Sequence, residues 1–159
     1  RIMVLINPDA DPLGAGYHVI QSQIAIGSGK FLGKGLFSGS QSQLNFLPEN
    51  HTDFIFAVIG EEMGFIGSFV LILVYGYLLY RTLRIAGEAQ DDFGMLLASG
   101  IASMWAFHLL VNVGMTMGIM PVTGVPLPFV SYGLSSLLTN LSAVAILMNI
   151  YIRRRKISF

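Results

Sequence analysis

Three long apolar stretches, separated by polar segments, dominate the chain after its first third. They cover residues 63–80, 95–120 and 134–152, and the first of them contains no charged side chain. A helix needs about 20 mostly apolar residues to cross the hydrocarbon layer of a bilayer, so the pattern predicts three transmembrane helices. Lys and Arg are also absent between Arg84 and Arg153, which leaves most of the polar chemistry to the loops.

The polar segments complete the prediction of an all-α membrane bundle. The first loop is expected to hold a short amphipathic helix at 17–26 and a glycine-rich stretch at 27–39. Thr52 or Asp53 is expected to cap the helix that follows, because both residue types accept hydrogen bonds from free N–H groups at a helix start. The predicted order is a large outer loop (1–53), a helix (54–80), a connector (81–94), a helix (95–120), an irregular segment (121–133), a helix (134–152) and a basic tail (153–159).

Residues 121–133 are apolar but unsuited to a regular helix. Three prolines interrupt the segment, Pro121, Pro126 and Pro128, and proline lacks the N–H group that a helix interior needs. A bilayer tolerates irregular backbone only where protein or a water-filled cavity covers it. The segment therefore predicts a re-entrant structure that packs over other parts of the protein.

The composition supports the membrane assignment and predicts an orientation. The chain is 53% hydrophobic and 11% charged, with a mean hydropathy of +0.67, whereas soluble domains are about 25% charged. Six of the nine basic residues lie in two clusters, 81–84 and 153–156, and basic residues favour the cytoplasmic ends of spans. Two crossings separate the clusters, so both are expected on the cytoplasmic side. The first loop and the proline-rich segment then share the outer face.

The densest polar cluster, residues 41–53, ends where the first span begins. Asp53 has two interpretations there. One is a plain helix cap, favoured by the positive end of the helix dipole. The other is a general base at the membrane surface, with Glu49 and His51 near enough in sequence to orient a hydroxyl group or tune the aspartate.

Polar side chains in and beside the predicted spans also have a structural and a functional interpretation. Glu61 and Glu62 rise about 12 Å along the helix from Asp53, which does not suit a glycosidase-type carboxylate pair. A hydrogen bond inside the bundle is favoured for them, although an acid at that depth is a functional candidate. His108 and Asn112 are four residues apart and share a helix face. Interhelical hydrogen bonding is favoured for this pair over a ligand or proton-relay role.

Two lysines of the first loop, Lys30 and Lys34, flank glycines. They are expected either to meet an anionic head group or to lie on a solvated surface. The basic block 153–156 is most simply a topology anchor that touches anionic membrane lipids, and no nucleic-acid role is expected. The sequence shows no cysteine, no zinc cluster and no Ser/His/Asp triad.

Several longer motifs resemble a single family of bacterial membrane proteins. They occupy residues 7–17 (NPDADPLGAGY), 21–29 (QSQIAIGSG), 46–57 (FLPENHTDFIFA) with 60–64 (GEEMG), and 126–133 (PLPFVSYG). Together they resemble the SEDS (shape, elongation, division and sporulation) family over essentially the whole chain. The Asn-His-Thr-Asp form and Gln41-Ser-Gln43 are closer to its RodA branch than to its FtsW branch.

The resemblance implies the last loop and last three helices of a ten-span enzyme of the bacterial cytoplasmic membrane. Such glycosyltransferases polymerise lipid II into peptidoglycan strands during cell elongation and shape maintenance, and they work with a class B penicillin-binding protein. The family's essential loop aspartate matches Asp53, which would act as general base in an inverting transfer. A divalent cation, Mg²⁺ or Mn²⁺, is an option at the pyrophosphate. The residues expected to contact substrate are Lys30, Lys34, Gln41, Glu49, His51, Thr52, Ser131 and Tyr132.

Two other functions remain open. Polar re-entrant segments with intramembrane His and Asn also suit a transporter, such as a flippase for a lipid-linked cell-wall precursor. A scaffold for a penicillin-binding protein is the third option. A flippase needs charged groups along a path across the bilayer, whereas the polar residues of this chain gather on one face, so the pattern favours the enzyme.

Overall fold

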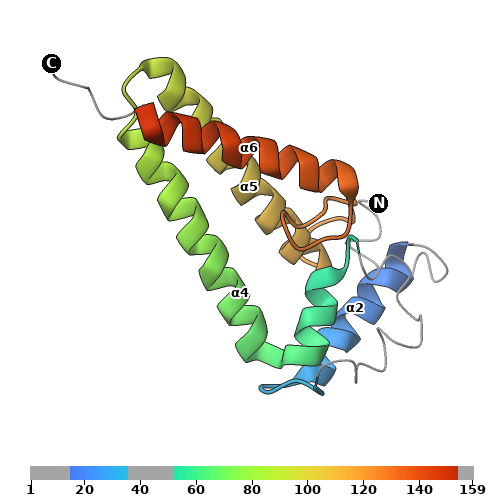
Figure 1. Ribbon diagram of the computed structural model, residues 1–159. Helices are drawn as coiled ribbons and strands as arrows, with labels where there is room; N and C mark the ends of the chain where they lie inside the picture. The colour runs from blue at the N-terminus through green and yellow to red at the C-terminus, as the bar shows by residue number, and fades with distance from the viewer. Residues whose placement is uncertain (1–14, 36–51, 154–159) are drawn as a thin grey trace, which may run out of the picture.

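The structure is a computed structural model that describes residues 15–35 and 52–153. All regular structure in these ranges is helical, as predicted, and three of the helices are long and apolar enough to cross a membrane. Figure 1 shows their arrangement. The helices are α2 (Ala15–Gly29), α4 (Ile55–Gly87), α5 (Asp92–Thr116) and α6 (Leu134–Arg153).

Helix α4 is broken at Gly64, where the backbone adopts φ 65° and ψ −160°. The break divides α4 into a short first half, residues 55–63, and a long second half, residues 65–87, which meet at a sharp angle in Figure 1. At 1.5 Å per residue the second half rises about 35 Å, enough for a hydrocarbon layer of about 30 Å. The prediction of one continuous helix over 54–80 was therefore wrong, because the backbone at Gly64 is not helical. Only the second half is long enough to span the hydrocarbon layer.

The loop that follows α2 supplies the hydrogen bonds that α4 loses at its break. A broken helix leaves N–H groups free on one side and C=O groups free on the other, and both kinds need partners. Residues 30–35 provide both, accepting from the second half and donating to the first. The four bonds join Phe65 N to Lys30 O (2.9 Å), Ile66 N to Phe31 O (3.3 Å), Lys34 N to Glu61 O (3.0 Å) and Gly35 N to Glu62 O (3.1 Å).

Glycines permit the close approach of these two segments. A Cβ atom on Gly29 would overlap the backbone oxygen of Gly60, and one on Gly33 would overlap the backbone oxygen of Glu62. Gly64 has in addition a φ and ψ combination that is essentially restricted to glycine. The glycine-rich stretch is therefore a packing element against α4.

The three long helices meet in a hydrophobic cluster toward the cytoplasmic end of the predicted orientation. Within it, the buried indole Nε1 of Trp105 donates to Asn140 Oδ1 at 2.8 Å. The buried members of the cluster come from α4, α5 and α6, and they are Ala86, Ala98, Ile101, Trp105, Ala143 and Leu147.

Other helix boundaries also differ from the prediction. The predicted connector 81–94 is mostly helical, because α4 continues to Gly87 and α5 begins at Asp92 with Asp91 as its N-cap. α2 covers 15–29, longer than the predicted 17–26, and α5 stops at Thr116, four residues before the predicted end. α6 matches the predicted 134–152 to within one residue.

Candidate functional site

The segment that carries Asp53 lies directly before the first half of α4. The helix begins at Ile55 with Phe54 in the N-cap position and no side-chain cap. Neither Thr52 nor Asp53 occupies that position, so the predicted cap was wrong. The half-buried side chain of Asp53 is therefore not explained by helix capping.

Asn112 holds the backbone of this segment from α5. Its side chain is fully buried, and its Nδ2 donates to the carbonyl oxygens of Asp53, at 2.9 Å, and Val125, at 2.8 Å. The prediction of interhelical hydrogen bonds for His108 and Asn112 was therefore wrong in its partners, because Asn112 bonds to two non-helical segments and His108 Nδ1 has no partner among the described residues. One amide thus ties the aspartate segment and the proline-rich segment to the same turn of α5.

The proline-rich segment makes a second connection to the aspartate segment. Ser131 Oγ donates to the carbonyl oxygen of Thr52 at 2.6 Å and accepts from the backbone N–H of Leu127 at 2.8 Å. The segment is irregular throughout, as its prolines predict. Ser131 therefore joins the proline-rich segment to the residue directly before Asp53.

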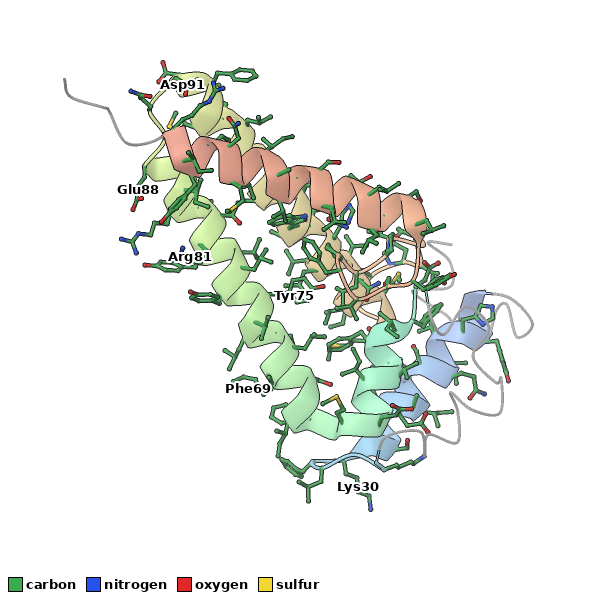
Figure 2. All side chains as sticks on the ribbon, viewed as in Figure 1. Lys30, Phe69, Tyr75, Arg81, Glu88 and Asp91 are labelled. Carbon is green, nitrogen blue, oxygen red and sulfur yellow. The ribbon has the colours of Figure 1, made fainter. Side chains whose placement is uncertain are left out.

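A hydroxyl group on α4 supports the proline-rich segment from the opposite side. The buried Tyr75 donates its hydroxyl hydrogen bond to the carbonyl oxygen of Pro128, and Figure 2 shows Tyr75 on the second half of α4. Phe129, the next residue, adopts a positive φ of 64° and packs its ring edge-on against Trp105, with centroids 5.4 Å apart. These contacts explain how an apolar, helix-free segment remains ordered.

Gly124 brings the proline-rich segment next to the carboxylate of Asp53. Its φ of 72° favours glycine, and a Cβ atom at this position would stand 3.1 Å from Asp53 Oδ2. Glycine is thus required by the backbone conformation and leaves room beside the carboxylate oxygen. The result is a carboxylate on a fixed backbone, at the junction of α5, α4 and the irregular segment.

The two lysines of the glycine-rich stretch have different surroundings. Lys34 Nζ forms an ion pair of 2.9 Å with Glu61 Oε1; the Glu61 side chain is fully buried, and that of Lys34 is 31% exposed. This confirms the internal partner expected for Glu61. Lys30 lies exposed directly after α2, at the bend of α4 in Figure 2.

The other predicted site residues are only partly placed by the structure. Tyr132 leaves 76% of its surface exposed, and His108 Nδ1 is buried without a hydrogen-bond partner among the described residues. In the described ranges, no three Asp, Glu or His side chains form a group suited to a metal ion. Gln41, Glu49 and His51 lie outside the described residues.

Sequence reasoning missed Tyr75, and it singled out Gly124 only as a sign of close packing, together with Gly114 and Gly118. A tyrosine in the middle of an aliphatic span is a usable signal, because aromatic residues with polar tips normally lie at membrane interfaces and a buried hydroxyl needs a partner. Gly124 carries no comparable signal, since a glycine between prolines is expected in any irregular segment.

The chain matches known proteins along nearly all of its length. The family FtsW/RodA/SpoVE, described as cell cycle proteins, matches residues 1–156. Peptidoglycan glycosyltransferase MrdB of Escherichia coli is 52% identical over 158 residues, which cover 99% of this chain and 43% of that protein. A probable peptidoglycan glycosyltransferase FtsW of Trichlorobacter lovleyi is 52% identical over 150 residues, covering 94% of this chain and 39% of that protein.

A solved structure agrees with these relatives. It belongs to a study of the structural coordination of polymerization and crosslinking by a peptidoglycan synthase complex, and it has a TM-score of 0.76 at 33% identity. The match covers 98% of this chain and 42% of the solved one. The chain therefore spans less than half the length of the proteins it resembles, and relatives of both the MrdB/RodA and the FtsW type are similar to it. By its sequence and its fold, the chain belongs to the FtsW/RodA/SpoVE (SEDS) family of cell cycle proteins.

Proposed function

We propose that the protein containing this chain is a peptidoglycan glycosyltransferase that polymerises lipid II, with Asp53 as its general base. The observation that carries the proposal is the carboxylate of Asp53 on a backbone fixed by Asn112. Two relatives that are 52% identical, a peptidoglycan glycosyltransferase MrdB and a probable peptidoglycan glycosyltransferase FtsW, support the same reaction class. A carboxylate on a fixed backbone at a loop junction suits proton abstraction.

The proposed reaction is a single displacement. The 4-hydroxyl oxygen of the acceptor sugar forms a bond to the anomeric carbon of the donor, and its proton passes to the Asp53 carboxylate. The bond between that carbon and the diphosphate oxygen breaks, and its electron pair leaves with undecaprenyl diphosphate. Diphosphate departs readily, so the reaction needs a base more than it needs an acid, and it inverts the anomeric carbon.

The main contribution of α5 and the proline-rich segment to this reaction is to fix the backbone that carries Asp53. Asn112 and Ser131 hold the backbone carbonyls of Asp53 and Thr52 from two directions. A catalytic group held in one orientation avoids the entropic cost of finding it during the reaction. Because Lys34 is engaged with Glu61, Lys30 is the lysine proposed to meet a substrate diphosphate, at a place other than the leaving group beside Asp53.

The setting proposed for this reaction is the outer face of the bacterial cytoplasmic membrane, within a ten-span protein of the elongation and cell-shape machinery. Support for the orientation comes from Arg81, Arg84 and Arg153, which lie near the C-terminal ends of α4 and α6, whereas Asp53 directly precedes the N-terminal part of α4. A class B penicillin-binding protein is the proposed partner. A solved peptidoglycan synthase complex with the same fold supports that partner.

A flippase is the competing function, and the described spans favour it less. The second half of α4 has no Asp, Glu, Lys or Arg before Arg81, and α5 has none after Asp92. Transport of a diphosphate across the bilayer needs polar or charged groups along the path. The amide nitrogen of Asn112 and the amide oxygen of Asn140 are bonded within the protein, which leaves His108 Nδ1 and Asn112 Oδ1 as the buried atoms of α5 without a partner among the described residues.

The test compares Asp53→Asn with Asp91→Asn in the purified full-length protein. Lipid II polymerisation is measured by gel separation of the glycan products, and folded protein by thermal melting. General-base assistance is worth about 10²–10⁴-fold in rate, so Asp53→Asn should lose most polymer at unchanged melting temperature. Asp91 caps α5, and Asn caps a helix as well as Asp does, so the control should keep its activity. Robust polymerisation by folded Asp53→Asn would end the assignment.

A further inference from the structure

An apolar groove lies inside the bend of α4. It has a volume of about 220 Å³ and is lined by both halves of α4, by α2 and by the last turns of α5. Pockets for drug-sized ligands have roughly 300–1,000 Å³, so this groove suits a short length of hydrocarbon chain. Its apolar wall includes Phe56, Phe65, Phe69, Ile72, Val113 and Met117, and its one charged lining residue is Lys30.

The backbone at Lys30 has an unusual conformation. α2 ends at Gly29, and Lys30 follows with φ 50°, in the left-handed region that glycine adopts without cost. Four glycines lie within five residues of this position, yet the left-handed residue is a lysine. A left-handed residue is common directly after a helix, and here it puts an exposed lysine at the rim of the groove.

Lys30 is too far from Asp53 to neutralise a diphosphate that leaves from the reacting carbon. The carbonyl oxygen of Lys30 bonds to Phe65 N at the break, whereas Asp53 precedes the start of α4. The first half of α4, about 13 Å long, separates them. A leaving diphosphate is bonded to the carbon that the activated hydroxyl attacks, so its place is beside Asp53.

In the acceptor, by contrast, the diphosphate lies far from the reacting group. In lipid II the reacting 4-hydroxyl is on the far sugar of a disaccharide, and the diphosphate is on the near sugar, followed by the isoprenoid chain. Two linked sugars bridge a gap of the length of that half-helix. The lysine and the aspartate therefore match the diphosphate and the reacting hydroxyl of one acceptor molecule, and the apolar groove that Lys30 lines matches the start of its isoprenoid chain.

We propose that the groove inside the bend of α4 binds the first part of the acceptor's isoprenoid chain, with Lys30 at its diphosphate. The inference rests on the proposed function, because it uses Asp53 as the base for the acceptor hydroxyl. The break at Gly64 forms this binding site, because both halves of α4 supply walls of the groove.

The test is photo-crosslinking of the full-length protein with lipid-linked disaccharide diphosphates, followed by peptide mapping. One probe carries a diazirine in the isoprenoid chain close to the diphosphate, and the other carries it on the terminal sugar. The chain probe should label α4 and α5 at the groove, and the sugar probe should label the region of Asp53. Using Asp53→Asn protein prevents turnover, so labelling is measured independently of polymerisation.

Two variants with matched controls test the groove itself. Lys30→Gly suits a φ of 50°, so it should weaken probe binding by about two- to fivefold, the contribution of one exposed charge, without lowering the melting temperature. The control is Arg81→Ala, which removes a basic side chain away from the groove and should leave binding unchanged. Alanine is used because Arg81 lies inside α4, where glycine would destabilise the helix. Ser68→Phe fills the groove and should abolish labelling by the chain probe. Its control is Ser142→Phe, because Ser68 and Ser142 both donate to the carbonyl four residues earlier, and Ser142 is exposed on α6.

Each contrary result overturns the inference without touching the assignment of Asp53. Equal labelling by a phosphatidylglycerol that carries the same diazirine would mean that bulk lipid fills the groove. No labelling from either probe would mean that the rest of the protein covers it. Exchanged labelling sites would place the donor there. Unchanged binding in Lys30→Gly would remove the lysine from the site, and polymerisation assays on protein that keeps Asp53 report separately on the proposed function.

Discussion

Asn112 donates a hydrogen bond of 2.9 Å to the backbone carbonyl of Asp53, which precedes it by 59 positions in the chain. The donor lies on a predicted membrane span and is fully buried. The acceptor belongs to the residue that carries the proposed base. An amide inside a membrane protein thus positions a carboxylate without touching it.

Asn112→Ala should lower activity more than it lowers stability. The variant leaves two buried carbonyl oxygens without their donor, at a cost of about 1–3 kcal/mol for an unsatisfied group. Release of the Asp53 backbone should cost more in rate, since a shift of about 1 Å at a catalytic group costs up to 10²-fold. The measurements are kcat for lipid II polymerisation and the melting temperature. The control is Asn149→Ala, which removes an exposed asparagine from α6. Unchanged kcat in folded Asn112→Ala protein would show that the carbonyl contact does not position the base.

Gly64→Ala should prevent normal folding, whereas Gly76→Ala in the same helix should not. At Gly64 a Cβ atom would overlap the backbone nitrogen of Gly33, and the backbone conformation alone costs a non-glycine residue about 1–3 kcal/mol. Gly76 has no heavy atom within 4 Å of its Cβ position, and alanine favours helix over glycine by up to about 1 kcal/mol. Size-exclusion profiles and melting temperatures measure both. Normal folding of Gly64→Ala would show that the break is dispensable.

The ion pair between Lys34 and Glu61 should respond unequally to removal of its partners. Lys34→Met leaves the carboxylate of Glu61 fully buried without the lysine, and breaking a buried pair costs up to about 3–5 kcal/mol. Glu61→Gln should cost less, because the lysine side chain is 31% exposed and water reaches it. The double variant should recover part of the loss of Lys34→Met. Melting temperatures measure the order, and Arg84→Met, which breaks the exposed pair with Glu88, is the control expected to change little. Equal losses in both single variants would contradict this account.

The predicted orientation is measured by cysteine labelling in intact cells, with a full-length protein otherwise free of cysteine. Thr123→Cys lies in the proline-rich segment, and Gln90→Cys lies in the connector between α4 and α5; both positions are exposed. An impermeant thiol reagent should modify the first and spare the second, because the basic residues favour a cytoplasmic connector. The reverse pattern would put Asp53 on the wrong side for a reaction at the outer face.

Much of the membrane architecture could be predicted because it depends on contiguous residues. The third span was predicted to within one residue of α6, since the transfer of a helix into a bilayer is a sum over its own side chains. The irregularity of 121–133 was also predictable, because proline acts on the backbone locally. Asp53 and Ser131 were candidates from the sequence, and the structure brings their two segments together through Thr52.

The break in α4 was decided by tertiary structure. Residues 54–80 read as one helix because glycine is tolerated in a helix at a cost of only about 1 kcal/mol, so Gly64 by itself predicts no interruption. What stabilises the break is the loop at residues 30–35, which replaces the lost hydrogen bonds from a distant part of the sequence.

The same distinction holds at the candidate site. The sequence by itself determined which segments cross the membrane, which segment is irregular and that Asn112 needs an internal partner, because these follow from local composition and from the cost of an unpaired polar group in hydrocarbon. Tertiary structure alone decided that this partner is the carbonyl of Asp53, that Gly124 approaches its carboxylate and that Lys34 pairs with Glu61. Such pairings depend on how the segments pack in three dimensions, and no local pattern encodes the distance between residues that are dozens of positions apart.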